Sequence, residues 1–157
     1  MRQRGTPDIL LECDASFWGW SCCGVHLATN ETFAFSEPWS SAMRHRFGDK
    51  LRQSTLAEPF GVLFSIDRSR QRFPDATRFG VTNDNTVAIV AHTNGFNSHS
   101  YDINECLRLR ETMLPREEFD VDIRHVAGVT NMADDGSRGR RVGEVDGGVL
   151  RSRWGLV

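Results

Sequence analysis

Acidic side chains occur in four segments of the chain where an acid is chemically informative. Asp14 ends an apolar, strand-like run and is followed by a turn rich in Gly and Trp. Glu58 stands near the start of a helical pattern, and Asp84 follows another strand-like run. The fourth segment offers two adjacent acids, Asp134 and Asp135. Carboxylates are ligands that Mg²⁺ prefers, so acids brought together from separate elements would form a metal-binding cluster.

Such a cluster suits the hydrolysis of a phosphodiester bond. Two divalent ions about 3.5–4 Å apart can activate the attacking water and stabilise the leaving oxygen of an in-line displacement. Without the ions, the grouped acids repel one another, and we expect this repulsion to destabilise the fold.

Each acid also has a purely structural explanation. Asp14 can start a turn through its own side chain. Glu58 stands three residues after Thr55, which is the spacing of a helix capping box. Asp84 can favour the start of the following helix through the helix dipole, and the same explanation applies to the two adjacent acids further along.

Hydrophobic periodicity predicts the elements that must position these acids. Strands are expected over residues 8–16, 20–28 and 33–39, as an antiparallel meander, and over 78–82 and 121–126. Helices are expected over 56–68, 86–91 and 102–114, with a short helix beginning near Asn131. Residues 40–53 and 93–100 are expected to be irregular. This order predicts an α/β fold with one five-stranded mixed sheet, three antiparallel strands followed by parallel additions, flanked by helices.

Some helical positions depart from the simple pattern. Glu58 lies away from the apolar side of residues 56–63, and Pro59 follows it directly. Proline is tolerated in the first turn of a helix but pushes the preceding residue out of α geometry, so Pro59 bears on whether Glu58 can reach the cluster. Arg110 falls inside the apolar side of its helix, and the sequence offers no reason for it.

Length and composition indicate a soluble, single-domain protein. The chain of 157 residues is long enough to bury one hydrophobic core. Its 4 cysteines lack the spacing of zinc ligands or of a disulfide framework, which favours a reducing, intracellular setting. No apolar run approaches the ~20 residues of a membrane helix, and residues 1–4 lack the apolar core of a secretory signal. We therefore expect no membrane contact, while the compartment stays open.

The charge pattern is uneven along the chain. A net charge of −2 argues against a uniformly basic nucleic-acid binder. Arginines nevertheless cluster over residues 68–72 and 138–153, where their guanidinium groups could hold phosphates in two-pronged fashion. A solvated arginine-rich surface is the alternative explanation.

Taken together, the acidic segments resemble the RNase H domains of retroelement reverse transcriptases. The motifs run from Asp14 to Ser21, Leu56-Ala57-Glu58, Asp84-Asn85-Thr86, and from His125 to Gly139. They occur in the family's order on the expected element types and cover roughly residues 8–139. The closing motif is most similar to the DIRS-type and BEL-type branches. The resemblance implies an RNase H-like fold over residues 1–139. Residues 140–157 are rich in Gly and Arg with no clear element, and we expect them to form a C-terminal tail or a partner-binding segment.

The resemblance also implies an activity. It predicts an Mg²⁺-dependent ribonuclease H that cuts the RNA strand of RNA:DNA hybrids with two ions, for which Mn²⁺ could substitute. In such an enzyme Asp14 would bridge the ions, Glu58 and Asp84 would bind one of them, and Asp134 the other. His125 would assist product release or proton transfer. A reverse-transcriptase polymerase domain is an expected partner.

The position of the fourth acid depends on how the closing motif is counted. Counting back from Ser137-Arg138 selects Asp134, whereas counting forward from His125 and Asn131 selects Asp135. We favour Asp134, because the string that begins at Asn131 then matches without a gap.

Short polar side chains beside the acids could read the substrate. An RNA:DNA hybrid displays 2′-hydroxyl groups in a wide, shallow minor groove. Ser16, Asn83 and Asn85 flank the acids and are the expected contacts to it.

Two other functions are compatible with the same segments. Pro59 and the arginine-rich tail are also compatible with a catalytically impaired RNase H-like scaffold or RNA-binding subunit of a ribonucleoprotein assembly. Integrases and junction resolvases, too, place carboxylate clusters on this architecture, so the fold by itself does not select the reaction.

Overall fold

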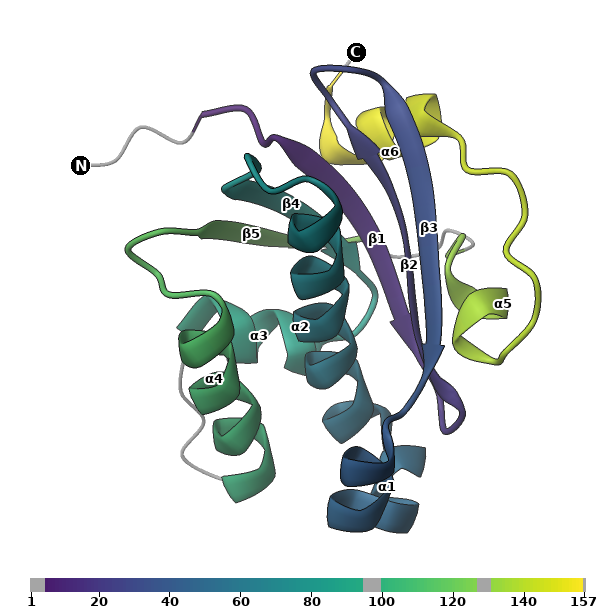
Figure 1. Cartoon of the computed structure of the whole chain (residues 1–157), viewed down its shortest axis with the longest axis vertical. Coiled ribbons are helices and arrows are strands. Elements are labelled where there is room, and N and C mark those ends of the chain that lie inside the picture. The colour runs from purple at the N-terminus through teal and green to yellow at the C-terminus, as the bar shows by residue number, and fades with distance from the viewer. Residues whose placement is uncertain (1–4, 95–99, 127–130, 157) are drawn as a thin grey trace.

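A computed structural model describes residues 5–94, 100–126 and 131–156 and contains one five-stranded sheet flanked by helices (Figure 1). The strands are β1 (Ile9–Ala15), β2 (Gly19–His26), β3 (Glu31–Pro38), β4 (Arg78–Asn83) and β5 (Asp120–His125). The helices are α1 (Ser41–Phe47), η1 (Gly48–Arg52), α2 (Ser54–Arg72), α3 (Thr86–Asn94), α4 (Tyr101–Met113), α5 (Asp134–Ser137) and α6 (Gly147–Trp154). The predicted α/β fold class is confirmed, with three antiparallel strands followed by two parallel ones.

The strand order brings the predicted acids to one end of the sheet. The order is β3-β2-β1-β4-β5, so β1 pairs with β2 on one side and with β4 on the other. The pairing of β1 with β4 is parallel, with Glu12 opposite Thr82. Because parallel neighbours end at the same edge of a sheet, Asp14 near the end of β1 and Asp84 just after β4 lie close together.

The longest helix, α2, covers one face of the sheet next to β1 (Figure 1). Alternate β1 side chains, among them Ile9 and Leu11, pack with Phe60 and Leu63 of this helix in the main core. Helices α3 and α4 also contact α2. The helix is therefore buried almost all round from residue 56 to 63, and the expectation that Glu58 lies away from its buried side is wrong.

Residues 40–53 form α1 and η1, so the expectation of an irregular segment is wrong. Ser40 caps α1, because its hydroxyl accepts a hydrogen bond from the Met43 amide at 3.2 Å. Met43, Phe47 and Leu51 recur every four residues and are buried, and the Phe47 ring lies 5.1 Å from that of Phe60. The sequence contains this helical period, but charged residues stand between the apolar ones and obscure the pattern.

The segment after Arg138 also contains a helix, contrary to the expected tail without a clear element. Asp146 caps α6, since its carboxylate accepts hydrogen bonds from the amides of Gly148 at 2.9 Å and Val149 at 3.2 Å. Two consecutive glycines open this helix, and glycine has a low intrinsic helix propensity. The sequence pattern therefore gave a weak helix signal, which packing on the sheet overrides.

Helix α6 covers the face of the sheet opposite α2. Its Leu150 and Trp154 side chains form a second buried cluster with Leu10 and Val25 of the sheet. The indole lies so close to the backbone of β4 that a Cβ atom at Gly80 would come within 2.9 Å of the ring. Both faces of the central strands are therefore buried, and α6 contributes directly to the core.

A buried ion pair joins α6 to the strand that carries Asp14. Glu12 of β1 is only 3% exposed and accepts a hydrogen bond from the Arg153 guanidinium of α6. Burial raises the pKa of Glu12, and the charge of Arg153 opposes that rise. Removing one partner alone would leave a buried charge without compensation, which is strongly destabilising.

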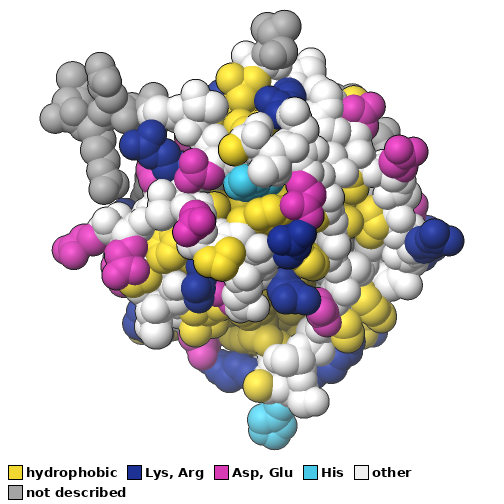
Figure 2. All heavy atoms as spheres, turned by 45° about the horizontal axis from the view of Figure 1, so that its top comes forward, with side chains coloured by type: hydrophobic (Ala, Val, Ile, Leu, Met, Phe, Trp, Pro, Cys, Tyr) yellow, Lys and Arg dark blue, Asp and Glu magenta, His cyan; other side chains and the backbone are white. Residues whose placement is uncertain are grey.

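The surface and the cysteines agree with the composition. Figure 2 shows acidic and basic side chains interspersed over the face seen there, in keeping with a net charge of −2. All four cysteines, Cys13, Cys22, Cys23 and Cys106, are buried free thiols. Among the described helices, none combines the length and the apolar character needed to span a membrane.

The packing of α6 can be tested by truncating its buried tryptophan. We expect Trp154→Ala to reduce the free energy of unfolding by about 3–5 kcal/mol, as for other buried large-to-small substitutions. Ser152→Ala, at an exposed position of the same helix, should change it by less than about 0.5 kcal/mol. Urea unfolding measures both values, and equal stability of the two variants would contradict the packing of α6 on the sheet.

Candidate metal centre

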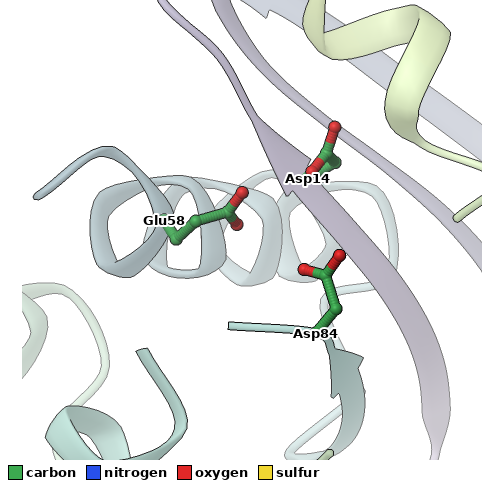
Figure 3. Close-up of side chains that lie close together, drawn as sticks. All are labelled: Asp14, Glu58 and Asp84. Atoms are coloured by element: carbon green, nitrogen blue, oxygen red, sulfur yellow. The ribbon is translucent and has the colours of Figure 1, made fainter. Parts of the chain in front are cut away.

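Three of the predicted acids converge on one point of the structure. Asp14 of β1, Glu58 of α2 and Asp84 after β4 each offer a carboxylate oxygen, and these oxygens all lie within 4.8 Å of one another. Figure 3 shows the three side chains reaching this point from three separate elements. Asp14 and Glu58 are buried, whereas Asp84 is exposed. The cluster is therefore set into the protein and open to solvent on the side of Asp84.

Asp14 is held by the short helix α5. The Ser137 hydroxyl donates a hydrogen bond to Asp14 Oδ2 at 2.7 Å. Hydroxyl groups of the sheet region in turn hold α5, because Ser21 donates to the Ala133 carbonyl and Ser36 donates to the Gly136 carbonyl. These bonds connect the closing motif to the strands and place its acids beside Asp14.

Glu58 reaches the cluster although Pro59 follows it within α2. Its Oε1 accepts a hydrogen bond from the Ala15 amide at 3.2 Å, and its Oε2 accepts one from Asn83 Nδ2 at 3.3 Å. Gln53 occupies the N-cap position of α2 without a side-chain capping hydrogen bond, and Glu58 lies beyond the first turn. The capping-box explanation of Glu58 is therefore wrong, since its carboxylate is directed toward β1 and β4.

A buried histidine fixes the backbone next to Glu58. His92 Nε2 lies 2.9 Å from the Pro59 carbonyl oxygen, and His92 Nδ1 lies 3.1 Å from Arg110 Nη1. A carbonyl only accepts and a guanidinium only donates, so Nε2 carries the proton, Nδ1 accepts, and the ring is neutral. Burial, followed by the charge of Arg110, lowers the pKa of His92 to about 4.

This contact also explains why Arg110 lies inside the apolar side of α4. Its Nη1 donates a second hydrogen bond, of 2.6 Å, to the His92 carbonyl. Arg110 therefore links α4 to the end of α3, and through the His92 ring to α2. The sequence offered only the misplaced charge as a signal, and nothing in the pattern pointed to His92.

Burial shapes the electrostatics of the acids. Desolvation raises the pKa of Asp14 to about 6, and the nearby Asp134 charge contributes to the rise. Desolvation followed by the Asp14 charge raises the pKa of Glu58 to about 9. The carboxyl groups of Asp14 and Glu58 therefore favour their protonated forms. A divalent cation bound to them would displace these protons.

The two adjacent acids of the closing motif face different surroundings. Asp134 lies near enough to Asp14 to raise its pKa and also pairs with Arg138 at 3.4 Å. Asp135 pairs with Arg140 at 3.6 Å, on the exposed side of α5. The described structure places Asp134 beside Asp14, outside the group of three converging acids. Its role as a metal ligand stays a prediction.

His125 stands at the end of β5 with its side chain exposed. Its backbone is opposite Asn83 in the parallel pair of β4 and β5, which brings it to the same end of the sheet as the acids. The central part of its motif, residues 127–130, lies outside the described residues. A part in proton transfer or product release stays a prediction.

The predicted substrate contacts have partners within the protein. Ser16 donates a hydrogen bond to the Ser137 carbonyl. Asn83 is only 2% exposed, donates to Glu58 and accepts from the Asn85 amide at 2.7 Å. The Asn85 side chain caps α3 by accepting from the amide three residues on at 3.0 Å. Asn83 thus orients Glu58, a role that the sequence did not reveal. Contact of Ser16, Asn83 and Asn85 with a substrate stays a prediction.

The repulsion between the acids predicts a pH-dependent stability. Because the pKa values of Asp14 and Glu58 are raised above 3.8 and 4.5 to about 6 and about 9, the folded state binds more protons in that window. In the absence of divalent ions, stability should fall as pH rises from about 4 to about 9. At pH about 8, Asp14→Asn should therefore be more stable than wild type by about 1–3 kcal/mol.

Urea unfolding between pH 5 and 9 measures this difference, and Asp75→Asn, at an exposed loop position, is the matched control. The stabilisation should be small at pH 5 and grow with pH for Asp14→Asn only. If Asp14→Asn differed from wild type in stability by the same amount at pH 5 and at pH 9, the repulsion between the acids would be contradicted.

The contacts of His92 predict that replacing it lowers the stability of the protein. His92→Phe leaves the Pro59 carbonyl and Arg110 without their partner, which should cost about 2–4 kcal/mol of unfolding free energy. His45→Phe, at an exposed position of α1, should cost less than about 0.5 kcal/mol. If His92 also positions Glu58, calorimetry should show divalent-ion affinity reduced about 10–100-fold for His92→Phe alone. Unchanged stability and ion affinity would refute the positioning role.

Comparison with known proteins bears on the fold. No protein-family model matches the chain, and no curated protein matches its sequence. Among solved structures, the chain is similar to the N-terminal RNase H domain of Rv2228c from Mycobacterium tuberculosis, solved as a fusion with maltose-binding protein. The TM-score is 0.63 at 13% sequence identity, over 84% of this chain and 97% of that chain. At this identity the similarity concerns the fold, and it shows that the chain adopts the RNase H-like fold.

Proposed function

We propose that the chain is a divalent-metal-dependent ribonuclease H that cuts the RNA strand of RNA:DNA hybrids. The observation that carries this proposal is the convergence of Asp14, Glu58 and Asp84 at one end of the sheet in an RNase H-like fold. Three carboxylates grouped in this way do not stabilise the fold, because burial and repulsion raise the pKa values of two of them.

The donor set suits a hard divalent cation. All three converging groups are carboxylates, and oxygen ligands are typical of Mg²⁺ and Mn²⁺. Asp14, Glu58 and Asp84 would hold one ion, and Asp14 with Asp134 would hold the second. Bound in this way, the ions would supply Lewis-acid stabilisation of the phosphodiester and a water of lowered pKa. Mg²⁺ is the proposed ion, with Mn²⁺ as a substitute.

The chain's own residues would prepare the site for that chemistry. The Ala15 amide and Asn83 keep the Glu58 carboxylate directed toward Asp14. Ser137 orients Asp14. Asp84, the exposed member of the cluster, faces the side from which a scissile phosphate can approach. His125 would act at the rim in product release or proton transfer.

The substrate side of the proposal uses residues around this rim. Ser16, Asn83 and Asn85 would recognise the minor groove, with Asn83 acting mainly through Glu58. Arg138 and Arg140 pair with Asp134 and Asp135 and are exposed, so they could exchange these partners for backbone phosphates.

The origin and setting of the enzyme form a further part of the proposal. The closing motif from His125 to Gly139 supports a retroelement origin, and with it a reverse-transcriptase polymerase domain as partner. The free cysteines favour an intracellular location. These inferences rest on the motifs and the composition.

Cleavage of a labelled RNA:DNA hybrid tests the proposal directly. Wild type should cut the RNA strand in Mg²⁺ or Mn²⁺ and lose activity in a chelator. Asp14→Asn and Asp84→Asn should each reduce the rate by on the order of 100-fold or more, because each removes a metal ligand. Asp75→Asn should leave the rate unchanged. Equal cleavage by the wild type and both site variants would sink the assignment.

Other outcomes of the same experiment select other functions. Cleavage of duplex DNA in preference to the hybrid would favour a nuclease of the integrase or resolvase type. Absence of any cleavage, together with no rise in melting temperature on adding divalent ions, would favour the RNA-binding scaffold. A rise in melting temperature that disappears in Asp14→Asn would show that the acids bind metal.

A further inference from the structure

A cavity of about 370 Å³ lies beside β5, the edge strand of the sheet. Phe79 and Val121 of the sheet line it together with residues of α3 and α4, and none of the three converging acids does. Its volume falls within the range of small-molecule sites. The cavity is therefore a feature separate from the candidate metal centre, and its chemistry can be considered by itself.

Positive charge dominates the lining. The arginines that line the cavity are Arg78, Arg110, Arg116 and Arg124. Two acids, Asp120 and Asp122, also line it. Asp122 pairs with Arg124 at 3.3 Å, and the same guanidinium lies over the Trp154 ring and donates to the Trp154 carbonyl at 2.8 Å. Arg124 is therefore already engaged, and of the other three arginines we consider the two on or just after α4, Arg110 and Arg116.

Arg110 is a buried cation with part of its donor capacity unused. It is only 6% exposed, and its Nη1 donates to the ring and the carbonyl of His92. Its Nε is buried without a hydrogen-bond partner. Within the described parts of the chain, Nη2 also makes no hydrogen bond, and no carboxylate lies within ion-pair distance of Arg110. Nε is thus a buried donor without an acceptor, which is costly in a protein interior, and Nη2 is a second donor without a protein acceptor on the same edge.

A second arginine increases this unbalanced charge. Burial lowers the pKa of Arg110, and the charge of Arg116 lowers it further. The only ion pair of Arg116 among the described residues is with Glu111, at 3.9 Å between half-exposed side chains, and such a pair contributes little. An anion between Arg110 and Arg116 would offset both the missing hydrogen bonds and the repulsion.

We propose that this cavity binds a phosphate group. Arg110 would be the buried anchor through its Nε–Nη2 edge, and Arg116 would close the contact from the exposed rim. Guanidinium groups bind phosphate through two parallel hydrogen bonds, and a phosphate offers enough oxygens for both arginines at once. The phosphate could belong to a free ligand such as a nucleotide or to a nucleic-acid backbone. The inference does not rest on the proposed cleavage activity.

Calorimetric titration of the full chain tests the site without requiring catalysis. The measurement uses inorganic phosphate at constant ionic strength in a chelator, so that no metal-bound phosphate contributes. Wild type should bind phosphate saturably, and Arg116→Gln should weaken binding by at least about tenfold. Arg108→Gln removes the same charge from an exposed position of α4 outside the cavity and should bind as wild type does.

Further titrations identify the source of the phosphate. A nucleoside 5′-monophosphate that binds more tightly than inorganic phosphate, with the same loss in Arg116→Gln, supports a free ligand. A weaker affinity of Arg116→Gln for RNA:DNA hybrid, measured in the same chelator, supports a backbone phosphate. Arg110→Gln should abolish binding, but it also breaks the His92 contact, so Arg116→Gln carries the test. No saturable phosphate binding, or equal weakening in Arg116→Gln and Arg108→Gln, overturns the proposal.

Discussion

Asp14 and Glu58 face each other as buried carboxylates, and the structure around them must keep them close against desolvation and mutual repulsion. Burial raises the pKa values of both carboxyl groups, and the Asp14 charge raises that of Glu58 further, so a bound cation would offset an unfavourable arrangement. The site can persist only if the elements that carry it are stabilised elsewhere. Much of the remaining architecture is explained by this requirement.

The supports come from both faces of the sheet. On one face, Asn83 and the Ala15 amide hold Glu58, while His92 holds the backbone just after it. On the other face, Ser137 of α5 holds Asp14, and α6 packs on the same strand through Leu10 and the buried Glu12–Arg153 pair. The strand β1 is therefore fixed from both sides at the point where the acids meet.

One buried cation, Arg110, lies on α4. Arg110 links His92 to α4 and at the same time lines the cavity beside β5, so one buried guanidinium belongs to both the support of Glu58 and the proposed phosphate site. A ligand in that cavity would act on the same hydrogen bonds that position the Pro59 carbonyl. The two sites are thus physically connected through His92, by contacts of 2.9 Å and 3.1 Å.

Sequence alone determined the order of the five strands and of α2, α3 and α4, the mixed sheet and the three acids that converge, because strand and helix periods and the strand-end positions of Asp14 and Asp84 are local properties. It missed α1, η1 and α6, whose local signals are weak and whose stability comes from packing. It also could not show that Pro59 leaves Glu58 in place. Only the tertiary structure decided that, because His92 and Asn83 reach Glu58 and its neighbour from distant parts of the chain, and such contacts have no local pattern.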